Sequence, residues 1–486
     1  MLNESQALSQ NLNQNNKVEI IWIDKNLGNQ ENQQYISDLK SSGTKSMSNV
    51  KTIVLSNGLQ MNREPLSKKK CDIQEYTDLD AAIEYIKTLR FMATIIIVSG
   101  SYLLDFIKKF KDNIRHIYII PRIIVFTNPT RTFSEEVLKE KFYASVIIRN
   151  FEKLKATLNS HLNNLEQFDN NNRELMNKQY PLQSIFVAIN TKDNLKLPKY
   201  YEKLVELLQT KDNANFISQM FNNYKKDPKY NSLLNQMIFV SDIPIELLVK
   251  YYARLYSIDG DFYKKMNYEL TTETGDNEIY QPYIKTLYEG IDKKFFNKCE
   301  GMELYSSQSL SENEINEILA YKNNFLKDSN ELKKDLPTPI IFSKIFLSFN
   351  KDINEAEKYI RYGKNVLITL KINDNKYDLR THADIEEFSF YPNEKEVLFF
   401  PYSAFGIKNI EFDPNKKLYN IELIYYGKFN KEFKESQKTN SIDFAKFILK
   451  TGLIKEIPET DNPHGPESGP KPGASRSSDK SCCFIL

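Results

Sequence analysis

The chain has 486 residues, too many for a single hydrophobic core, and 41% of them are hydrophobic, so the composition predicts two or three globular domains. Lys and Arg number 66 against 64 Asp and Glu, and without a long basic run this near balance argues against a nucleic-acid partner. Four scattered cysteines exclude a disulfide framework and favour a reducing, cytoplasmic compartment.

The first pattern, over residues 17–155, alternates β-branched runs with helical stretches. The expected strands are 18–24, 52–55, 93–100, 119–127 and 144–150. Near-continuous apolar strands joined by helices indicate a parallel sheet covered on both faces. The order of elements resembles the doubly wound, flavodoxin-like receiver domain of response regulators. Such a receiver accepts phosphate on an aspartate after its third strand, where this chain has Ser99, so the resemblance implies a binding or scaffolding domain without phosphotransfer.

The composition and periodicity of the sequence then change three times along the chain. Residues 1–16 and the Asn-rich stretch 156–180 are expected to be a disordered leader and a linker. Residues 181–455 begin with helical periodicity and continue, from 340, with strands at 339–349, 365–372, 387–392, 396–407 and 420–429. Helices followed by strands predict an α+β domain with an antiparallel sheet core. Residues 456–486, rich in Pro, Gly and Ser, are expected to be a disordered tail.

The tail ends in "CFIL", residues 483–486, which fits the C-a-a-X pattern for prenylation. Cys483 would carry the prenyl group, and Cys482 is the candidate for a second, palmitoyl group because one lipid chain anchors only weakly. We therefore expect a protein held at the cytosolic face of a membrane by its lipid, with no spanning helix.

Familiar catalytic motifs are missing from the sequence. There is no G-x-G-x-x-G, no P-loop and no nucleophile elbow, and the four histidines are not spaced as metal ligands, so we expect no metal. Three segments of the C-terminal domain remain: "ELYSSQ" from residue 303, "FSKIFLSFN" from residue 342, and "YPNEKEVLFFPY" from residue 391.

In this order the three segments resemble the motifs of arginine-type mono-ADP-ribosyltransferases: an Arg in L-Y-R-G, a strand with S-T-S or S-F-S, and E-x-E before V-L. The resemblance covers most of residues 180–430 and implies NAD as co-substrate and a protein arginine as acceptor. It assigns Glu396 to stabilising the charge that develops as nicotinamide leaves, and Glu394 to orienting and deprotonating the guanidinium. Strand alternation predicts that both carboxylates point to one face of a strand.

The remaining positions follow from the same resemblance. Ser348 would hold the ribose and position the glutamate, Phe349 would pack on the nicotinamide, and Asn350 stands where the family has its second Ser. In the best alignment Tyr305, Ser306 and Ser307 match the Y-R-G of the first motif, so Ser306 replaces the Arg that grips the NAD phosphates. The alternative alignment, "LYEG" at 287–290, keeps the Gly but has Glu289 in place of the Arg. A lysine such as Lys344 or Lys298 would have to compensate.

Three functions stay open at this point. The first is a transferase, weakened by the loss of the Arg, and the second is a catalytically inactive binding module with the transferase fold. The third is a membrane-tethered adaptor in which the receiver-like domain is the working part. The oligomeric state is not predicted.

Overall fold

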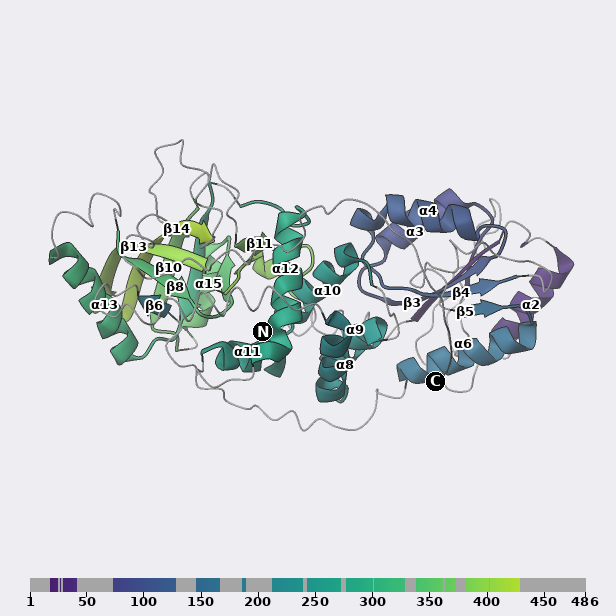
Figure 1. The fold of residues 1–486 in the computed structure, drawn as a ribbon, viewed down its shortest axis with the longest axis horizontal. Helices are drawn as coiled ribbons and strands as arrows, with labels where there is room; N and C mark the ends of the chain where they lie inside the picture. The colour runs from purple at the N-terminus through teal and green to yellow at the C-terminus, as the bar shows by residue number, and fades with distance from the viewer. Residues whose placement is uncertain are drawn as a thin grey trace, which may run out of the picture.

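A computed structural model of the chain describes residues 18–24, 27, 29–41, 73–127, 146–166, 186–188, 212–238, 243–271, 277–299, 301–327, 338–361, 363–372, 381–401 and 403–428. The predicted leader and C-terminal tail, Cys482, Cys483 and the expected strand 52–55 lie outside these residues. Within them, no helix is long and apolar enough to cross a membrane. Two sheets lie at opposite ends of the elongated molecule, and helices fill the space between them (Figure 1).

The N-terminal sheet is parallel, as the sequence predicts, and has the strand order β2-β1-β3-β4-β5. This is the order of doubly wound sheets of the flavodoxin type, while the likeness to a receiver stays a prediction. Its strands are β1 (Val18–Ile23), β2 (Ile73–Tyr76), β3 (Ala93–Ser99), β4 (Arg122–Phe126) and β5 (Val146–Ile148). The sequence analysis did not name β2, a short strand that contains Gln and Glu.

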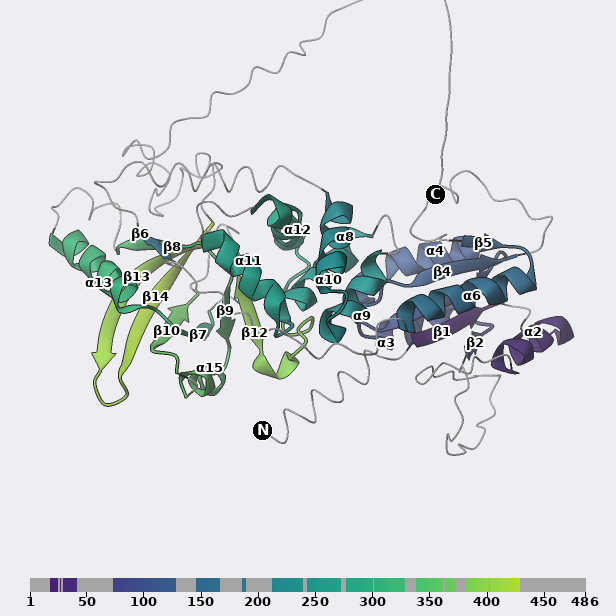
Figure 2. The ribbon, with the colours of Figure 1, turned by 90° about the horizontal axis from the view of Figure 1, so that it is seen from below.

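Alternate residues of these strands enter two different apolar clusters, because successive strand side chains point to opposite faces. One cluster includes Trp22 and joins helices α2 (Gln30–Ser41) and α6 (Phe151–Glu166). The other includes Ile21 and joins helices α3 (Leu79–Thr88) and α4 (Leu103–Asp112). Figure 2 shows α6 and α4 on either side of the sheet. The second cluster continues without a break into the rest of the molecule.

The middle of the molecule is helical, in agreement with the predicted periodicity. Its helices are α8 (Asn213–Tyr224), α9 (Pro228–Ile238), α10 (Ile245–Ser257), α11 (Asp261–Thr271) and α12 (Gln281–Asp292), with the 3-10 turns η1 (Ile114–His116) and η2 (Asn277–Tyr280). Tyr251, Tyr252 and Tyr283 are fully buried here. Helix α10 is buried along most of its length and lies between the two sheets (Figure 1).

The second sheet has the order β11-β12-β9-β7-β10-β14-β13-β8-β6. Its strands are β6 (Phe186–Ala188), β7 (Glu303–Gln308), β8 (Ile340–Ser343), β9 (Leu347–Asn350), β10 (Val366–Lys371), β11 (His382–Asp384), β12 (Glu396–Phe399), β13 (Ser403–Asp413) and β14 (Leu418–Lys428). The predicted antiparallel core is corrected in one place, because β10 and β14 are paired in parallel. The sheet is therefore mixed.

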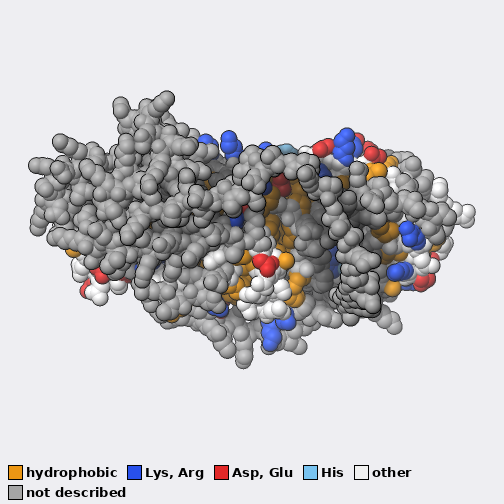
Figure 3. Space-filling view, viewed as in Figure 1, with side chains coloured by type: hydrophobic (Ala, Val, Ile, Leu, Met, Phe, Trp, Pro, Cys, Tyr) orange, Lys and Arg blue, Asp and Glu red, His pale blue; other side chains and the backbone are white. Residues whose placement is uncertain are grey.

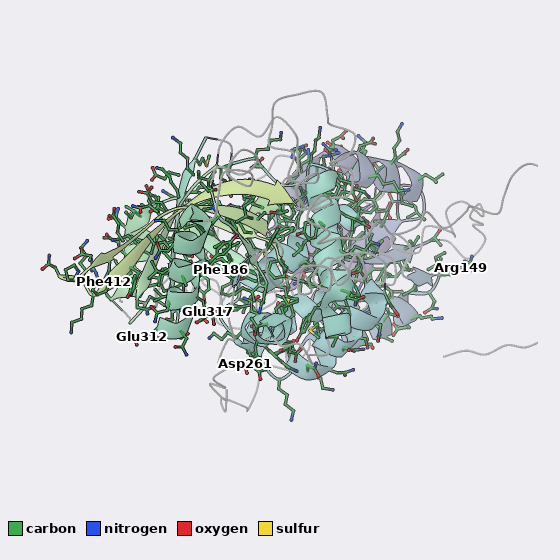
Figure 4. The ribbon with its side chains drawn as sticks, turned by 60° about the vertical axis from the view of Figure 1, so that its left-hand side comes forward. Arg149, Phe186, Asp261, Glu312, Glu317 and Phe412 are labelled. Carbon is green, nitrogen blue, oxygen red and sulfur yellow. The ribbon has the colours of Figure 1, made fainter. Side chains whose placement is uncertain are left out.

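Two helices and a long hairpin complete this part. Helix α13 (Glu312–Lys327) carries Glu312 and Glu317, and helix α15 (Ile353–Ile360) follows β9. At the far end of the β13–β14 hairpin, Phe412 is half exposed and its ring lies 4.7 Å from that of Tyr419. Figure 4 shows Phe412 at the edge of the molecule, away from α11 and its Asp261.

Three predicted strands differ from the structure. The stretch 339–349 is divided into β8 and β9, and 396–407 is divided into β12 and the beginning of β13. Residues 387–391 form turns instead of a strand, and they lead into the 3-10 turn η3 (Pro392–Glu394). The backbone N–H groups of Phe388 and Ser389 both bond to the carbonyl of Ile385. An apolar, aromatic run indicates burial as readily as it indicates a strand, and here the burial comes from tertiary packing.

Candidate active site

Glu396 begins strand β12 beside β9, and the two strands position it. In the antiparallel register Glu396 lies opposite Asn350, and Leu398 lies opposite Ser348. The side chain of Glu396 is 5% exposed. Its pKa is raised to about 7, mainly by burial and also by the charge of Glu394, while a hydrogen bond with Ser348 acts in the opposite direction. The structure thus brings Glu396, Ser348 and Asn350 together.

Glu394 is not on the strand. It ends the 3-10 turn η3, and the next residue, Lys395, has left-handed backbone angles, with φ 49° and ψ 49°. The prediction that both carboxylates follow strand alternation is therefore wrong, because the left-handed residue interrupts the strand between them. The turn still leaves Glu394 close enough to raise the pKa of Glu396.

Helix α15 supplies a partner for Glu394 that the sequence analysis missed. The hydroxyl of Tyr359 donates to the Glu394 carboxylate at 3.0 Å. Burial raises the pKa of Tyr359, and the charges of Glu394 and Glu396 raise it further. No spacing in the sequence links residue 359 to residue 394, so only the fold reveals this contact.

Helix α11 and its neighbours add tyrosines around the carboxylates. The pKa values of Tyr256 and Tyr263 are raised, first by burial and also by the charge of Glu396. Asn267 of α11 fixes the start of β9: its amide accepts from Phe346 N at 3.2 Å and donates to Phe346 O at 3.4 Å. The same helix that carries Tyr263 therefore sets the position of Ser348.

The first predicted motif forms strand β7, two strands away from Glu396. Ser306 is 1% exposed, and its hydroxyl donates to the Ser348 carbonyl at 2.6 Å. Ser307 donates to the carbonyl of Ala356 in α15 at 2.6 Å, and Tyr305 packs against the cluster that contains Ala356. These residues hold the strands and α15 in place, and the Ser306 hydroxyl contacts the backbone of β9.

The structure does not place Phe349 beside Glu396. Phe349 is fully buried, and its ring lies 5.0 Å from that of Phe399. Neighbouring residues of a strand point to opposite faces, so Phe349 faces away from Ser348 and Asn350. Its position in the hydrophobic core corrects the predicted contact with nicotinamide.

A cation that the sequence analysis did not consider lies near this group. Lys364 follows α15, and its backbone N–H bonds to the carbonyl of Tyr359 at 3.4 Å. Burial lowers the pKa of Lys364, as does the nearby charge of Lys264 in α11. Within the described part of the chain, the Lys364 ammonium has no hydrogen-bond acceptor. Lys264 is already paired with Asp259 at 3.2 Å, so it is the half-buried ammonium of Lys364 that favours an anion.

In the ranges that the structure describes, no group of three or more His, Cys, Asp or Glu is arranged to hold a metal ion. In Figure 3 apolar and charged side chains appear between the grey segments near the middle of the molecule.

The candidate site therefore consists of a buried carboxylate, a second carboxylate on a turn, hydroxyl and amide groups on β9, and tyrosines.

Comparisons with known proteins found no matching family model and no matching curated protein. The solved structures that match part of the chain include several ADP-ribosyltransferases. One from Clostridium botulinum is 13% identical, with a TM-score of 0.27 over 45% of this chain and 97% of its own. Another, from Pseudomonas syringae, is 13% identical, with a TM-score of 0.28 over 50% of this chain and 93% of its own.

A third match, the Vis toxin from Vibrio splendidus in complex with agmatine, is 20% identical, with a TM-score of 0.27 over 49% of this chain and 94% of its own. TM-scores of this size do not establish a shared fold. The function of the present chain is therefore derived from the geometry of its own site.

Proposed function

We propose that the chain transfers ADP-ribose from NAD to a protein arginine and releases nicotinamide. The observation that carries this proposal is the buried Glu396, bonded to Ser348 and with Glu394 on the adjoining turn. Breaking the bond between nicotinamide and ribose develops positive charge on the ribose, and a nearby carboxylate stabilises that charge most strongly where water is excluded. Glu396 has this environment.

The raised pKa of Glu396 determines which charge its carboxyl group carries when NAD binds. With a pKa raised to about 7, Glu396 is protonated in a large fraction of molecules at neutral pH. The positive charge of the nicotinamide ring would favour the ionised form when NAD binds. The ionised form is then the one that faces the developing oxocarbenium ion. The value of kcat/KM for NAD, which reports the protein without NAD, should therefore rise with pH through about 7.

The position of Glu394 suits it to bind the arginine acceptor. Its carboxylate lies on a turn and is partly exposed, and the Tyr359 hydroxyl orients it. An arginine guanidinium could bond to Glu394, lose a proton to it, and attack the ribose carbon on the face opposite the departing nicotinamide. The configuration at that carbon would invert.

The NAD phosphates need a cation, and Ser306 cannot supply one because it is neutral and buried. We propose Lys364 for this role, because its ammonium lacks an acceptor in the described residues, whereas the neighbouring Lys264 is already paired with Asp259. A lysine provides charge without the two parallel bonds of an arginine, so NAD affinity should be modest. The inactive binding module remains the second candidate, and the buried Ser306 is the observation that favours it.

The test is nicotinamide release from NAD by the purified chain, with agmatine as a small guanidinium acceptor. We expect turnover by the parent and a loss of roughly 10²- to 10³-fold in Glu396→Gln, the range seen when one electrostatic stabiliser is removed. Glu411→Gln is the matched control, because Glu411 is exposed on β13. Binding of NAD without any nicotinamide release would support the inactive module instead.

A further inference from the structure

Residues 385–391, which we call the approach segment, lead directly into the turn that carries Glu394. Their backbone has few sheet contacts. Ile385 N bonds to the Glu396 carbonyl at 3.0 Å. The N–H groups of Phe388 and Ser389 make turn bonds, and those of Phe390 and Tyr391 bond to side-chain hydroxyls. The position of the segment therefore depends on the side chains that surround it.

Helix α10 provides two of these contacts. The guanidinium of Arg254 donates to the carbonyls of Ser389, at 2.9 Å, and Phe388, at 3.4 Å. The same guanidinium lies 4.3 Å from the ring of Phe91 and 5.0 Å from that of Phe390. One turn further along α10, the hydroxyl of Ser257 accepts from Phe390 N at 2.7 Å.

The N-terminal domain provides the others. The hydroxyl of Tyr118 donates to the carboxylate of Glu387, and Arg90 lies 3.9 Å from the same carboxylate. The Tyr118 ring is stacked at 6.0 Å on that of Phe388, and the Arg90 guanidinium lies 3.5 Å from the Tyr118 ring centre. Two residues of the N-terminal domain thus hold the beginning of the approach segment.

Tyr118 is itself fixed from several sides. Phe91 N bonds to the Tyr118 carbonyl at 2.9 Å, although Phe91 has φ 52°, a value that a bulky residue adopts only when its surroundings impose it. The ammonium of Lys250 lies 4.2 Å from the Tyr118 ring centre. It donates to the carbonyls of Arg115 and Ile117, both at 2.7 Å.

A second chain of bonds joins the same region to α9 and α10. Tyr251 donates to Gln236 at 2.6 Å, Gln236 donates to the Phe91 carbonyl at 3.1 Å, and Ile120 N donates to the Tyr251 hydroxyl at 3.0 Å. These bonds are buried, where an unmade bond is costly. The contact between the N-terminal domain and the approach segment is therefore specific.

We propose that Tyr118 and Arg254 are positioning residues for the carboxylate pair, and that the N-terminal domain is a structural part of the site. Tyr118 holds Glu387, Arg254 holds the carbonyls of Phe388 and Ser389, and together they present the turn with Glu394 in one conformation. A displacement of the segment between α4 and β4, which contains Tyr118, would be transmitted to the turn with Glu394 through the contacts of Tyr118 with Glu387 and Phe388. The reaction affected rests on the proposed function, but the ordering of the approach segment does not.

The first measurement is amide hydrogen exchange in the full chain with Tyr118→Phe. This variant keeps the ring and removes only the hydroxyl that bonds to Glu387. Because the lost bond is to a charged group, exchange over residues 386–394 should be about tenfold faster, while β3 and β13 stay as in the parent. Tyr102→Phe is the control, since it removes a hydroxyl that bonds to the Thr77 carbonyl in the same domain.

The second measurement is nicotinamide release by Tyr118→Phe and by Arg254→Lys, which keeps the charge but loses the planar group between Phe91 and Phe390. If the two residues position the carboxylates, kcat should fall about tenfold while KM for NAD changes by less than about threefold. Tyr102→Phe should have the kcat of the parent. A general loss of stability would instead lower the unfolding temperature, and the apparent kcat would fall in proportion to the folded fraction of the protein.

The outcomes separate the two proposals. Unchanged exchange over residues 386–394 in Tyr118→Phe and in Arg254→Lys, measured in the same way, would overturn the positioning role, whatever the activity. Faster exchange in a parent that releases no nicotinamide would leave the positioning role intact and reject the proposed reaction. Faster exchange with an unchanged kcat would show that the approach segment does not position the carboxylates.

Discussion

At the scale of single residues, the proposed chemistry depends mainly on Glu396. Its carboxyl is nearly inaccessible, and the free-energy cost of ionising it there appears as a pKa of about 7 instead of 4.5. Among the described residues no Lys or Arg lowers that pKa. A buried carboxylate of this kind destabilises the folded chain when it is ionised, and under the proposed function its ionised form is the one that acts on NAD. This conflict between stability and function can be measured.

We predict that Glu396→Gln is more stable than the parent at pH 8. Below about pH 4.5 the carboxyl is protonated in both the folded and the unfolded chain, so its ionisation has no effect. Between pH 4.5 and 7 only the unfolded chain releases the proton, and the free energy of unfolding of the parent falls as pH rises. The advantage of the variant should grow from near zero at pH 4.5 to about 3 kcal/mol above pH 7.

Urea unfolding at several pH values tests this, with Glu411→Gln as the exposed control. A stability difference between Glu396→Gln and the parent that does not depend on pH would contradict the assigned ionisation.

A second residue-scale prediction concerns Ser306, at the position of the missing Arg. Because Ser306 is 1% exposed and bonded to the Ser348 carbonyl, an arginine has no room there. Ser306→Arg should lower the free energy of unfolding by several kcal/mol, through overpacking and a buried charge, and should not raise NAD turnover. Ser306→Ala should cost only about 1 kcal/mol. A stable Ser306→Arg with faster turnover would show that the site can still accept the Arg.

At the scale of elements, the turn between η3 and β12 separates the two carboxylates. Pro392 begins the turn, Lys395 N bonds to its carbonyl at 3.1 Å, and Lys395 takes the left-handed conformation. Lys351 at the end of β9 bonds to Asp384 at 2.6 Å and Glu386 at 2.8 Å, which ties the adjoining loop to the same strand. The geometry of the pair thus depends on one residue with positive φ.

We predict opposite effects from two substitutions at Lys395. Lys395→Gly should be neutral or slightly stabilising, because glycine adopts φ 49° without strain. Lys395→Ile should cost about 1–2 kcal/mol, because a β-branched side chain clashes in this conformation. Thermal unfolding and nicotinamide release of the two variants provide the comparison. Equal stability of both would mean that the left-handed turn is not maintained in solution.

At the scale of the whole molecule, the two sheets are joined by one buried apolar cluster. It contains Ile21 and Val98 of the N-terminal sheet, residues of α10, and Phe399 and Tyr425 of the second sheet. The sequence analysis expected two domains joined by a linker at 156–180. Helix α6 continues to Glu166, and the remaining residues of that stretch lie outside the described ranges.

We therefore predict a single cooperative thermal transition for the full chain, because a shared core couples the two sheets. Calorimetry should give a calorimetric enthalpy equal to the van't Hoff enthalpy. Two resolved transitions would show that the contacts of Tyr118, Lys250 and Arg254 do not couple the two parts. Prenylation of Cys483, a palmitoyl group on Cys482 and a place at a membrane stay predictions, since the described residues do not include these cysteines.

By itself, the amino-acid sequence determined the local and periodic features of this protein. Runs such as "ATIIIV" are rich in β-branched residues and apolar on both faces, which favours a buried strand, and the apolar spacing of 245–257 favours a buried helix. The order of Ser348, Glu394 and Glu396 also depends on sequence alone. These features need no information beyond neighbours along the chain.

The tertiary structure determined which residues that are distant in the sequence contact each other. The contacts of Tyr359 with Glu394, Tyr118 with Glu387 and Arg254 with Ser389 join residues 35, 269 and 135 positions apart. The core position of Phe349 and the burial of Ser306 also appear only in the fold. Burial and long-range contacts set the pKa of a carboxyl and the place of a cation, and both arise from the packing of distant segments against each other.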